Sequence, residues 1–257
     1  MRSKTLIVLL AVAAFAAVAP QAQAAIVLGT AENFAVLGGS GVTNTGSSVI
    51  NGGDVGSAPT STVIGFPPGL VNGGTLYTAA DPATTQAHVD LIAAYTAAQT
   101  APGGVTGPAD LGGANLSPGV YTYASTAPWT AGNLTLDGLG NPSAQWIFQI
   151  GTGLTTPAGV TVVLTNGASA DHVFWQVGSS ATLGAANTFA GNILAQTSIT
   201  LGGGTLYGRA LAIDGLVSIP VAQTINIPEP VTMTLVLLGA ALLPARRTRI
   251  GKGSRER

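Results

Sequence analysis

The stretch ATLGAANTFAGNILAQTSITLGGGTLYGRALAIDGLVSIP (181–220) repeats a short pattern at a nearly constant interval. Its segments ATLG, ITLG and VSIP begin at positions 181, 199 and 217, a constant step of 18, and GNILA at 191 is followed by GRALA at 208. Upstream, FQIGTGLTTPAG (148–159) aligns with WQVGSSATLGAA (175–186) at a constant shift of 27. A period of 18 suits one coil of a three-sided β-solenoid, with about six residues per side, and the longer step fits the same coil carrying a longer loop. A two-layer β-sandwich is the alternative, but it is not expected to return the same side chains with this period.

Side chains alternate between the two faces of a strand. We therefore predict an inward-facing set in these coils that consists of Ala181, Leu183, Ile199, Leu201, Val217 and Ile219. The residues between them would form an outward ladder of hydroxyl groups, Thr155, Thr182, Thr200 and Ser218, and a second side would carry Thr161, Thr188 and Thr205. Threonine also suits exposed strand positions for structural reasons alone. Ladders almost free of charge nevertheless indicate a functional surface, although Ala190, Tyr207 and Leu216 interrupt a uniform grid.

One segment has helical rather than strand spacing. Asp81 is a suitable N-cap, Pro82 occupies the first helical position, and Pro102 ends the pattern. The apolar residues between them recur at helical intervals on one face. The sequence therefore predicts one long helix over residues 82–101, packed beside the β body.

Both ends of the chain have the composition of targeting segments. Residues 1–24 combine a basic start, an apolar run and small residues at the expected cleavage point, which is typical of a secretory signal peptide. Residues 228–257 contain Pro228, Glu229 and Pro230, then a short apolar run and a basic tail. This order resembles the PEP-CTERM sorting signal of diderm bacteria, which implies processing by an exosortase-type membrane protease. An ordinary C-terminal membrane anchor is the alternative.

Removing both ends leaves residues 25–227 with one basic residue, Arg209, and eight acidic residues, a net charge of about −7. One cation cannot neutralise a row of phosphates, so nucleic-acid binding is excluded, and membrane contact is expected only through the transient C-terminal segment. The chain has no cysteine and therefore neither disulfides nor thiol chemistry. An apolar fraction of 46% argues for a folded domain.

The pattern of side chains gives little indication that the protein is an enzyme. The two histidines, His88 and His172, lack metal-binding spacing, so we expect neither a metal nor a cofactor. For the adjacent residues Asp171 and His172 we predict a turn that enters a strand rather than a catalytic dyad. We expect Arg209 to pair with Asp171 or Asp214 at a turn. Among the tryptophans, Trp146 and Trp175 are predicted in the core, whereas Trp129, in a loop, is a candidate for exposure.

Nearly all of residues 25–227 resembles one family, the secreted ice-binding proteins of bacteria, diatoms and fungi. The motifs that carry this resemblance occur in the expected order, namely LGTAENFAVLGGSGVTNTG (28–46), INGGDVGSAP (50–59), IGFPPG (64–69), DLGGANLSPGVY (110–121), WIFQIGTGLTT (146–156), VFWQVGSSATLG (173–184), TFAGNILAQTSITL (188–201) and YGRALAIDG (207–215). The resemblance implies a right-handed, three-sided, discontinuous β-solenoid with one long α-helix alongside. It also implies adsorption to an ice crystal surface through a flat, threonine-rich side.

The expectation is thus a secreted or cell-surface protein of a diderm bacterium. Its predicted partner is ice, which it would contact through one of the two ladders. A surface adhesin or a structural protein of an exopolysaccharide matrix is the alternative on the same scaffold. A polysaccharide-active enzyme is a minor alternative, because two carboxylates suffice for glycoside hydrolysis, although nothing in the sequence pairs them.

Overall fold

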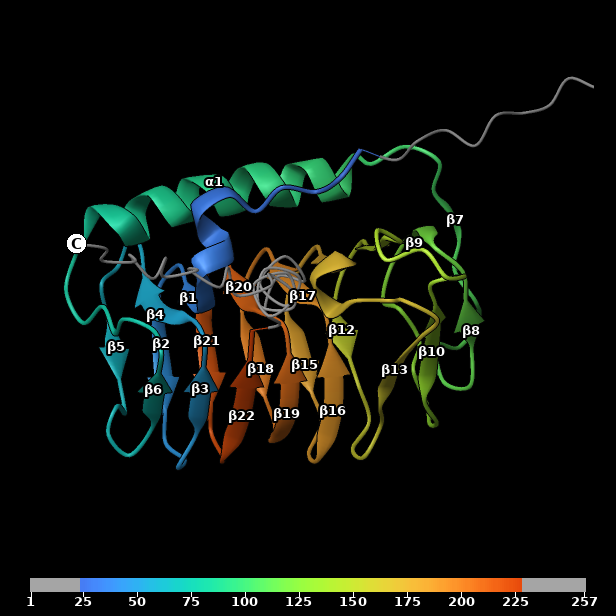
Figure 1. The fold of residues 1–257 in the computed structure, drawn as a ribbon. Coiled ribbons are helices and arrows are strands. Elements are labelled where there is room, and N and C mark those ends of the chain that lie inside the picture. The colour runs from blue at the N-terminus through green and yellow to red at the C-terminus, as the bar shows by residue number, and fades with distance from the viewer. Residues whose placement is uncertain (1–23, 228–257) are drawn as a thin grey trace, which may run out of the picture.

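The computed structural model describes residues 24–227, and these residues form parallel β-sheets with one long helix alongside (Figure 1). Sheet A contains, in spatial order, β4 (Asp54–Ser57), β1 (Phe34–Gly38), β20 (Ala210–Ala212), β17 (Asn192–Ala195), β14 (Val173–Val177), β11 (Trp146–Ile150), β9 (Gly119–Tyr123) and β7 (Val105–Thr106). Sheet B contains β12 (Leu154–Thr155), β15 (Ala181–Leu183), β18 (Ile199–Leu201), β21 (Leu216–Ile219), β2 (Gly41–Asn44) and β5 (Val63–Ile64).

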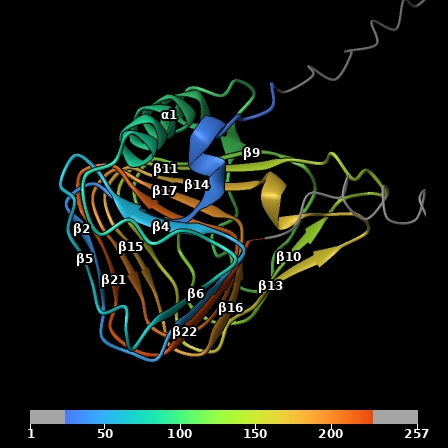
Figure 2. The ribbon, with the colours of Figure 1, turned by 60° about the vertical axis from the view of Figure 1, so that its left-hand side comes forward.

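Two further sheets complete the enclosure. Sheet C contains β16 (Asn187–Ala190), β19 (Gly204–Tyr207), β22 (Gln223–Asn226), β3 (Val49–Asn51) and β6 (Leu70–Asn72). Sheet D contains β13 (Val162–Thr165), β10 (Leu134–Asp137) and β8 (Asn115–Leu116). The helical elements are η1 (Gly29–Asn33), α1 (Pro82–Gln99) and η2 (Ala170–His172). Figure 2 shows the sheets around a common interior, with α1 outside them.

From β14 onward the chain visits sheets A, B and C in turn, so that each of these coils stacks on the one before. The coil β14–β15–β16 is followed by β17–β18–β19 and then by β20–β21–β22. In register, Ala181 lies beside Ile199 and Ile199 beside Val217, which confirms the predicted step from one coil to the next. Phe148 pairs with Trp175, which confirms the longer step upstream.

The order of coils along the stack differs from their order in the sequence. Strands β1, β2 and β3 pair with β20, β21 and β22, so the first coil of the chain lies against the last one. Helix α1 then carries the chain back along the stack to β7 at the opposite end (Figure 1). Its 18 residues span about 27 Å at 1.5 Å per residue, enough to pass five or six strands spaced about 4.8 Å apart. In sheet A the strands β4 and β7 are seven steps apart, about 34 Å, so the helix covers most of this return and the loops beside it cover the rest.

Helix α1 begins where the sequence predicts and ends at Gln99, slightly before the predicted end at residue 101. The Asp81 carboxylate accepts a hydrogen bond of 2.8 Å from the Ala83 amide, and Pro82 is the first helical residue. The buried face includes the predicted set Ala87, Leu91, Ala94, Tyr95 and Ala98. This face packs on the outer side of sheet A, whose strands are buried on both faces and therefore lack the alternation of sheet B.

The interior of the coils is a continuous apolar core. All six predicted inward residues of sheet B, from Ala181 to Ile219, are at most 4% exposed. Trp146 and Trp175 are fully buried as expected, and the Trp175 ring stacks on Phe148 at 4.0 Å between centroids. The expectation for Trp129 was wrong, because this side chain is 6% exposed. Its loop folds inward, its ring packs beside Trp175, and its N–H donates to the Gly132 carbonyl oxygen at 2.9 Å.

The two predicted targeting segments lie outside the described residues, except for Ala24. Between residues 24 and 227, no helix is both long enough and apolar enough to cross a membrane.

Candidate functional site

The outer surface of sheet B carries the first hydroxyl ladder. Register pairs join Thr155 to Thr182, Thr182 to Thr200 and Thr200 to Ser218, as predicted. The structure adds one rung that the sequence reasoning missed, because Ser218 also lies beside Thr43 of β2. Thr155 and Thr182 are exposed, and the other three hydroxyl residues are partly exposed. The result is an unbroken column of five hydroxyl side chains.

Two of the turns that follow strands of sheet B are closely packed. After β15 and after β18 the chain turns at a glycine, and a Cβ on Gly184 would lie 2.6 Å from the Pro157 carbonyl carbon. A Cβ on Gly202 would lie 2.5 Å from the Leu183 carbonyl oxygen, so both turns exclude side chains. Leu216 is 36% exposed and lies at the start of β21, two residues before Ser218 on the same face, so it interrupts the outward surface of sheet B beside the hydroxyl column, as expected. The column itself ends at Ile64, the register partner of Thr43.

Sheet C carries the second ladder. Thr161 pairs with Thr188 and Thr188 with Thr205, as predicted. The next rung is Thr224 of β22, which the sequence reasoning did not include. The ladder then passes to Val49 of β3, so hydroxyl groups occupy four consecutive rungs.

Beside the threonine ladder, sheet C carries a second outward column, which contains no threonine. Ala190, at 3% exposure, is covered, whereas Tyr207 in the next strand is 45% exposed. Tyr207 is followed in register by Asn226 and Asn51. The predicted interruption at Ala190 and Tyr207 therefore lies on sheet C, and the one at Leu216 lies on sheet B.

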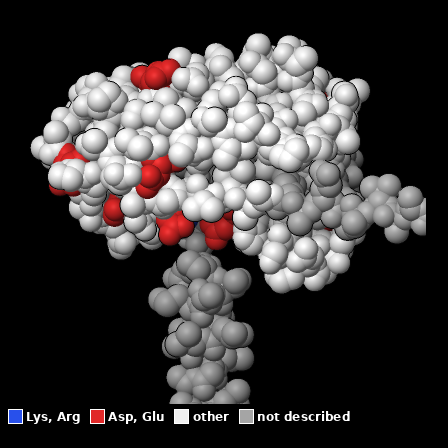
Figure 3. All heavy atoms as spheres, turned by 90° about the horizontal axis from the view of Figure 1, so that it is seen from above, with Lys and Arg blue, Asp and Glu red and all other residues white. Residues whose placement is uncertain are grey.

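Charge is absent from the strands of both ladders. Within the described residues, no strand of sheets B and C contains an acidic or basic residue. The carboxylates lie in helices, in turns and in sheets A and D, at Glu32, Asp54, Asp81, Asp90, Asp110, Asp137, Asp171 and Asp214. Figure 3, which looks onto the side that carries α1, shows several of them there. The two hydroxyl surfaces are thus neutral although the domain as a whole is acidic.

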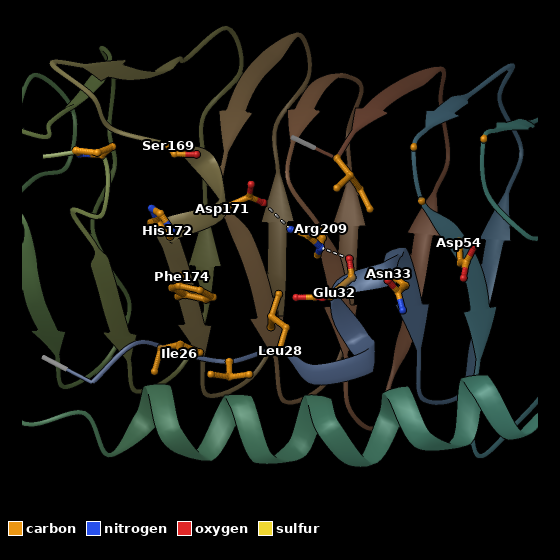
Figure 4. A pocket seen from close by; sticks show the side chains of 16 residues that line it. Ile26, Leu28, Glu32, Asn33, Asp54, Ser169, Asp171, His172, Phe174 and Arg209 are labelled. Atoms are coloured by element: carbon orange, nitrogen blue, oxygen red, sulfur yellow. Dashed lines mark hydrogen bonds and ion pairs between the residues drawn. The ribbon is translucent and has the colours of Figure 1, made fainter. Parts of the chain in front are cut away.

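Arg209 has the structural role that we expected. Its Nη1 atom lies 2.9 Å from the Asp171 carboxylate, and it is Asp171 rather than Asp214 that forms the pair (Figure 4). The Nε–H donates to the Glu32 carbonyl oxygen at 2.8 Å, and Nη1 also donates to the Asn192 side-chain oxygen at 2.9 Å. Arg209 is 7% exposed. It therefore ties η1, η2 and β17 together.

Arg209, Asp171 and His172 line an open groove of about 660 Å³ between η1 and η2 (Figure 4). Asp171 is directed to Arg209, and the buried Nδ1 atom of His172 has no hydrogen-bond partner among the described residues. The other histidine, His88, contacts the Ile213 carbonyl oxygen at 2.8 Å through Nε2. Among the described residues, Asp171 and the Nδ1 atom of His172 are therefore not hydrogen-bonded to each other. In residues 24–227, no three His, Asp or Glu side chains group as metal ligands would.

Comparison with known proteins places these features in a family. Residues 36–226 match the family model described as "Ice-binding-like". An ice-binding protein of Nostoc sp. (strain HG1) is 46% identical over 96% of this chain and 96% of its own length. An ice-binding protein of Flavobacterium frigoris (strain PS1) is 35% identical, with 72% of this chain and 71% of that protein covered.

Solved structures give the same result. The crystal structure of an ice-binding protein from an Antarctic biological consortium has a TM-score of 0.73 and 39% identity, covering 86% of this chain and 96% of that one. The DUF3494 domain of Shewanella frigidimarina ice-binding protein 1 has a TM-score of 0.74 and 28% identity, covering 80% and 99%. Parallel sheets, one long helix and matched sequence over most of the chain thus agree, and the protein belongs to the ice-binding-like family.

Proposed function

We propose that this protein adsorbs to ice through the outer surface of sheet B and thereby inhibits ice growth or recrystallisation. The observation that carries the proposal is the unbroken column of Thr155, Thr182, Thr200, Ser218 and Thr43 on a sheet without charge. Membership of the ice-binding-like family supports the same function.

The physical argument rests on rigidity and on the chemistry of the side chains. Adjacent strands lie about 4.8 Å apart, and β-branched threonine has a restricted χ1 angle. The hydroxyl and methyl groups therefore stand at regular intervals with little entropy to lose on adsorption. A charged group would bind water strongly in its own geometry, and the strands of sheet B carry none. Water held between such rungs can take up a lattice-like order.

Sheet B suits a flat crystal surface better than sheet C does. The second ladder, Thr161, Thr188, Thr205 and Thr224, is one rung shorter. In the same strand as Thr205, the half-exposed Tyr207 stands two residues away on the same face. A ring there would hold a flat surface away from the threonines beside it. Leu216 likewise stands two residues from Ser218 on sheet B, but its side chain is smaller than the tyrosine ring and less exposed, at 36% against 45%. We therefore assign ice adsorption to sheet B.

The proposal extends to architecture and location. We take the stack to be a right-handed, three-sided, discontinuous β-solenoid, which the parallel topology and the position of α1 support. We also propose export with loss of residues 1–24, and sorting of residues 228–257 by an exosortase-type protease to the surface of a diderm bacterium. Attachment to an exopolysaccharide matrix is the alternative role of the mature protein. The relatives compared above are named as ice-binding proteins rather than enzymes, which favours a non-enzymatic role.

The experiment compares substitutions on the two ladders in the same coil. Thr200→Tyr places a bulky ring in the centre of the sheet B column, and Thr205→Tyr is the matched control in the neighbouring strand of sheet C. Thermal hysteresis and ice-recrystallisation inhibition are measured on both variants and on the unsubstituted chain, with circular dichroism to check folding. We expect Thr200→Tyr to abolish both effects and Thr205→Tyr to retain them. Absence of any effect in the unsubstituted chain at high concentration would refute ice binding, and the reverse result for the variants would refute the choice of sheet B.

A further inference from the structure

A row of one aromatic and three amide side chains follows the outer surface of sheet C. Tyr207 pairs in register with Asn226, Asn226 with Asn51 and Asn51 with Asn72. We name these four residues the Tyr–Asn row. It crosses four successive strands, so it is about 14 Å long at 4.8 Å per strand. It runs parallel to the threonine ladder of the same sheet.

Hydrogen bonds between the amides fix their orientation. The Asn51 side-chain N–H donates to the Asn226 side-chain oxygen at 2.9 Å, and Asn72 donates to Asn51 at 3.1 Å. An amide has two N–H groups and two acceptor lone pairs. Asn51, which takes part in both bonds, therefore keeps one donor and one acceptor site unused. Because Asn72 is exposed and the other two are partly exposed, a row of oriented donors and acceptors faces solvent.

Tyr207 provides an apolar surface at one end of these amides. Its side chain is 45% exposed, whereas Leu206 before it points into the core and is fully buried. Its register neighbour on the other side is the small side chain of Ala190, so no bulky group stands beside the ring in that strand. An exposed aromatic ring offers a large contact area with few rotatable bonds, which lowers the entropy lost on binding.

The chemistry of the row selects its ligand. In the part of the chain that the structure describes, the strands of sheet C contain no acidic or basic residue, so the row itself offers no charge to balance a charged ligand. A suitable ligand is neutral and elongated, has an apolar C–H face for the ring, and has closely spaced hydroxyl groups for the amides. A polysaccharide chain combines these properties. We propose that the Tyr–Asn row binds a neutral polysaccharide that lies along the stack of coils.

This second site does not depend on ice adsorption by sheet B. It lies on a different sheet, and it explains why sheet C combines threonines with a projecting ring that a flat ice surface would not tolerate. A protein with both sites would hold a neutral glycan and ice at the same time, on two sides of one rigid body.

The test is a binding assay with the full chain and defined polysaccharides. Particles of the neutral polymers cellulose, chitin and curdlan, and beads of the anionic polymer alginate, are incubated with the unsubstituted chain and with its variants, and the bound fraction gives an affinity. We expect binding to at least one of the neutral polymers, and Tyr207→Ala should weaken it about tenfold, a loss of about 1.4 kcal/mol. Tyr207→Phe should bind within about threefold of the unsubstituted chain, because the ring is retained. Asn51→Ala, which breaks both amide hydrogen bonds, should also weaken binding.

The variants separate this site from the proposed ice surface. Thr200→Tyr should lose thermal hysteresis and keep polysaccharide binding, whereas Tyr207→Ala should do the opposite. Binding to none of the three neutral polymers, binding only to alginate, or equal binding by Tyr207→Ala would each overturn the proposal. The ice measurements would stand unaffected by any of these results.

Discussion

The interaction between Arg209 and Asp171 provides a direct test of what holds the coils together. Asp171→Asn preserves the shape of the side chain but removes the only carboxylate within 4.0 Å of Arg209 among the described residues. The guanidinium would remain in place with two neutral acceptors, the Glu32 carbonyl oxygen and the Asn192 side chain. A buried charge would therefore lose its counter-charge while its position stays fixed.

The magnitude follows from the burial of the two groups. Removing one partner of a fully buried ion pair costs about 3–5 kcal/mol, whereas an exposed pair contributes about 0–1 kcal/mol. The Arg209 side chain is 8% exposed and the Asp171 side chain 26% exposed, so water can partly replace the lost carboxylate. We expect the free energy of unfolding to fall by about 2 kcal/mol, between these two limits. In a domain of this size such a loss lowers the Tm by about 4–8 °C.

Thermal and urea denaturation followed by circular dichroism would measure this loss. The matched control is Asp214→Asn, since Asp214 is exposed and accepts a hydrogen bond from Gln196 rather than from a cation. The control should change the stability by less than about 0.5 kcal/mol. Adding Arg209→Met to Asp171→Asn should cost less than the sum of the two single changes, because the residues interact directly. A loss for Asp171→Asn no larger than that of the control would refute the structural role of the ion pair.

Two other predictions concern the core and the response to acid. Trp175→Ala should lower the free energy of unfolding by about 3–5 kcal/mol in urea titrations, because the ring is fully buried and stacks on Phe148. Tyr207→Ala at the surface should lower it far less. Similar losses for both variants would contradict the assignment of the core. A hydrogen bond from Thr30 holds the pKa of Asp90 below its ordinary range. A hydrogen bond from Thr130 does the same for the pKa of Asp110, and one from the Leu139 amide for the pKa of Asp137. Since a lowered pKa in the folded state favours folding while the carboxylates are ionised, stability should be constant from neutral pH to about pH 5 and fall below about pH 4. The Thr130→Val variant should show a weaker fall in denaturation midpoints across the same pH series, and an unchanged acid dependence would count against the Asp110 contribution.

Features that depend on neighbours in the sequence could be predicted from the sequence. The alternation of Ala181, Thr182 and Leu183 assigns each side chain to one face because successive strand residues point in opposite directions. The regular repeat likewise predicted that Thr182 lies beside Thr200, since the segments ATLG, ITLG and VSIP recur at a constant step in the sequence. Helix α1 was predictable from its N-cap and its apolar spacing, since both act within a few residues.

Features that depend on distant contacts required the tertiary structure. Thr43 joins the sheet B ladder only because β2 lies against β21, and no repeat links two segments so far apart in the sequence. Packing also decided that Trp129 turns into the core and that Arg209 pairs with Asp171 rather than with Asp214. The Tyr–Asn row likewise consists of residues from β19, β22, β3 and β6, which only the stacking of the first coil on the last brings together. Backbone alternation is a local property of each strand, but the pairing of strands is decided by the burial of apolar surface across the whole stack.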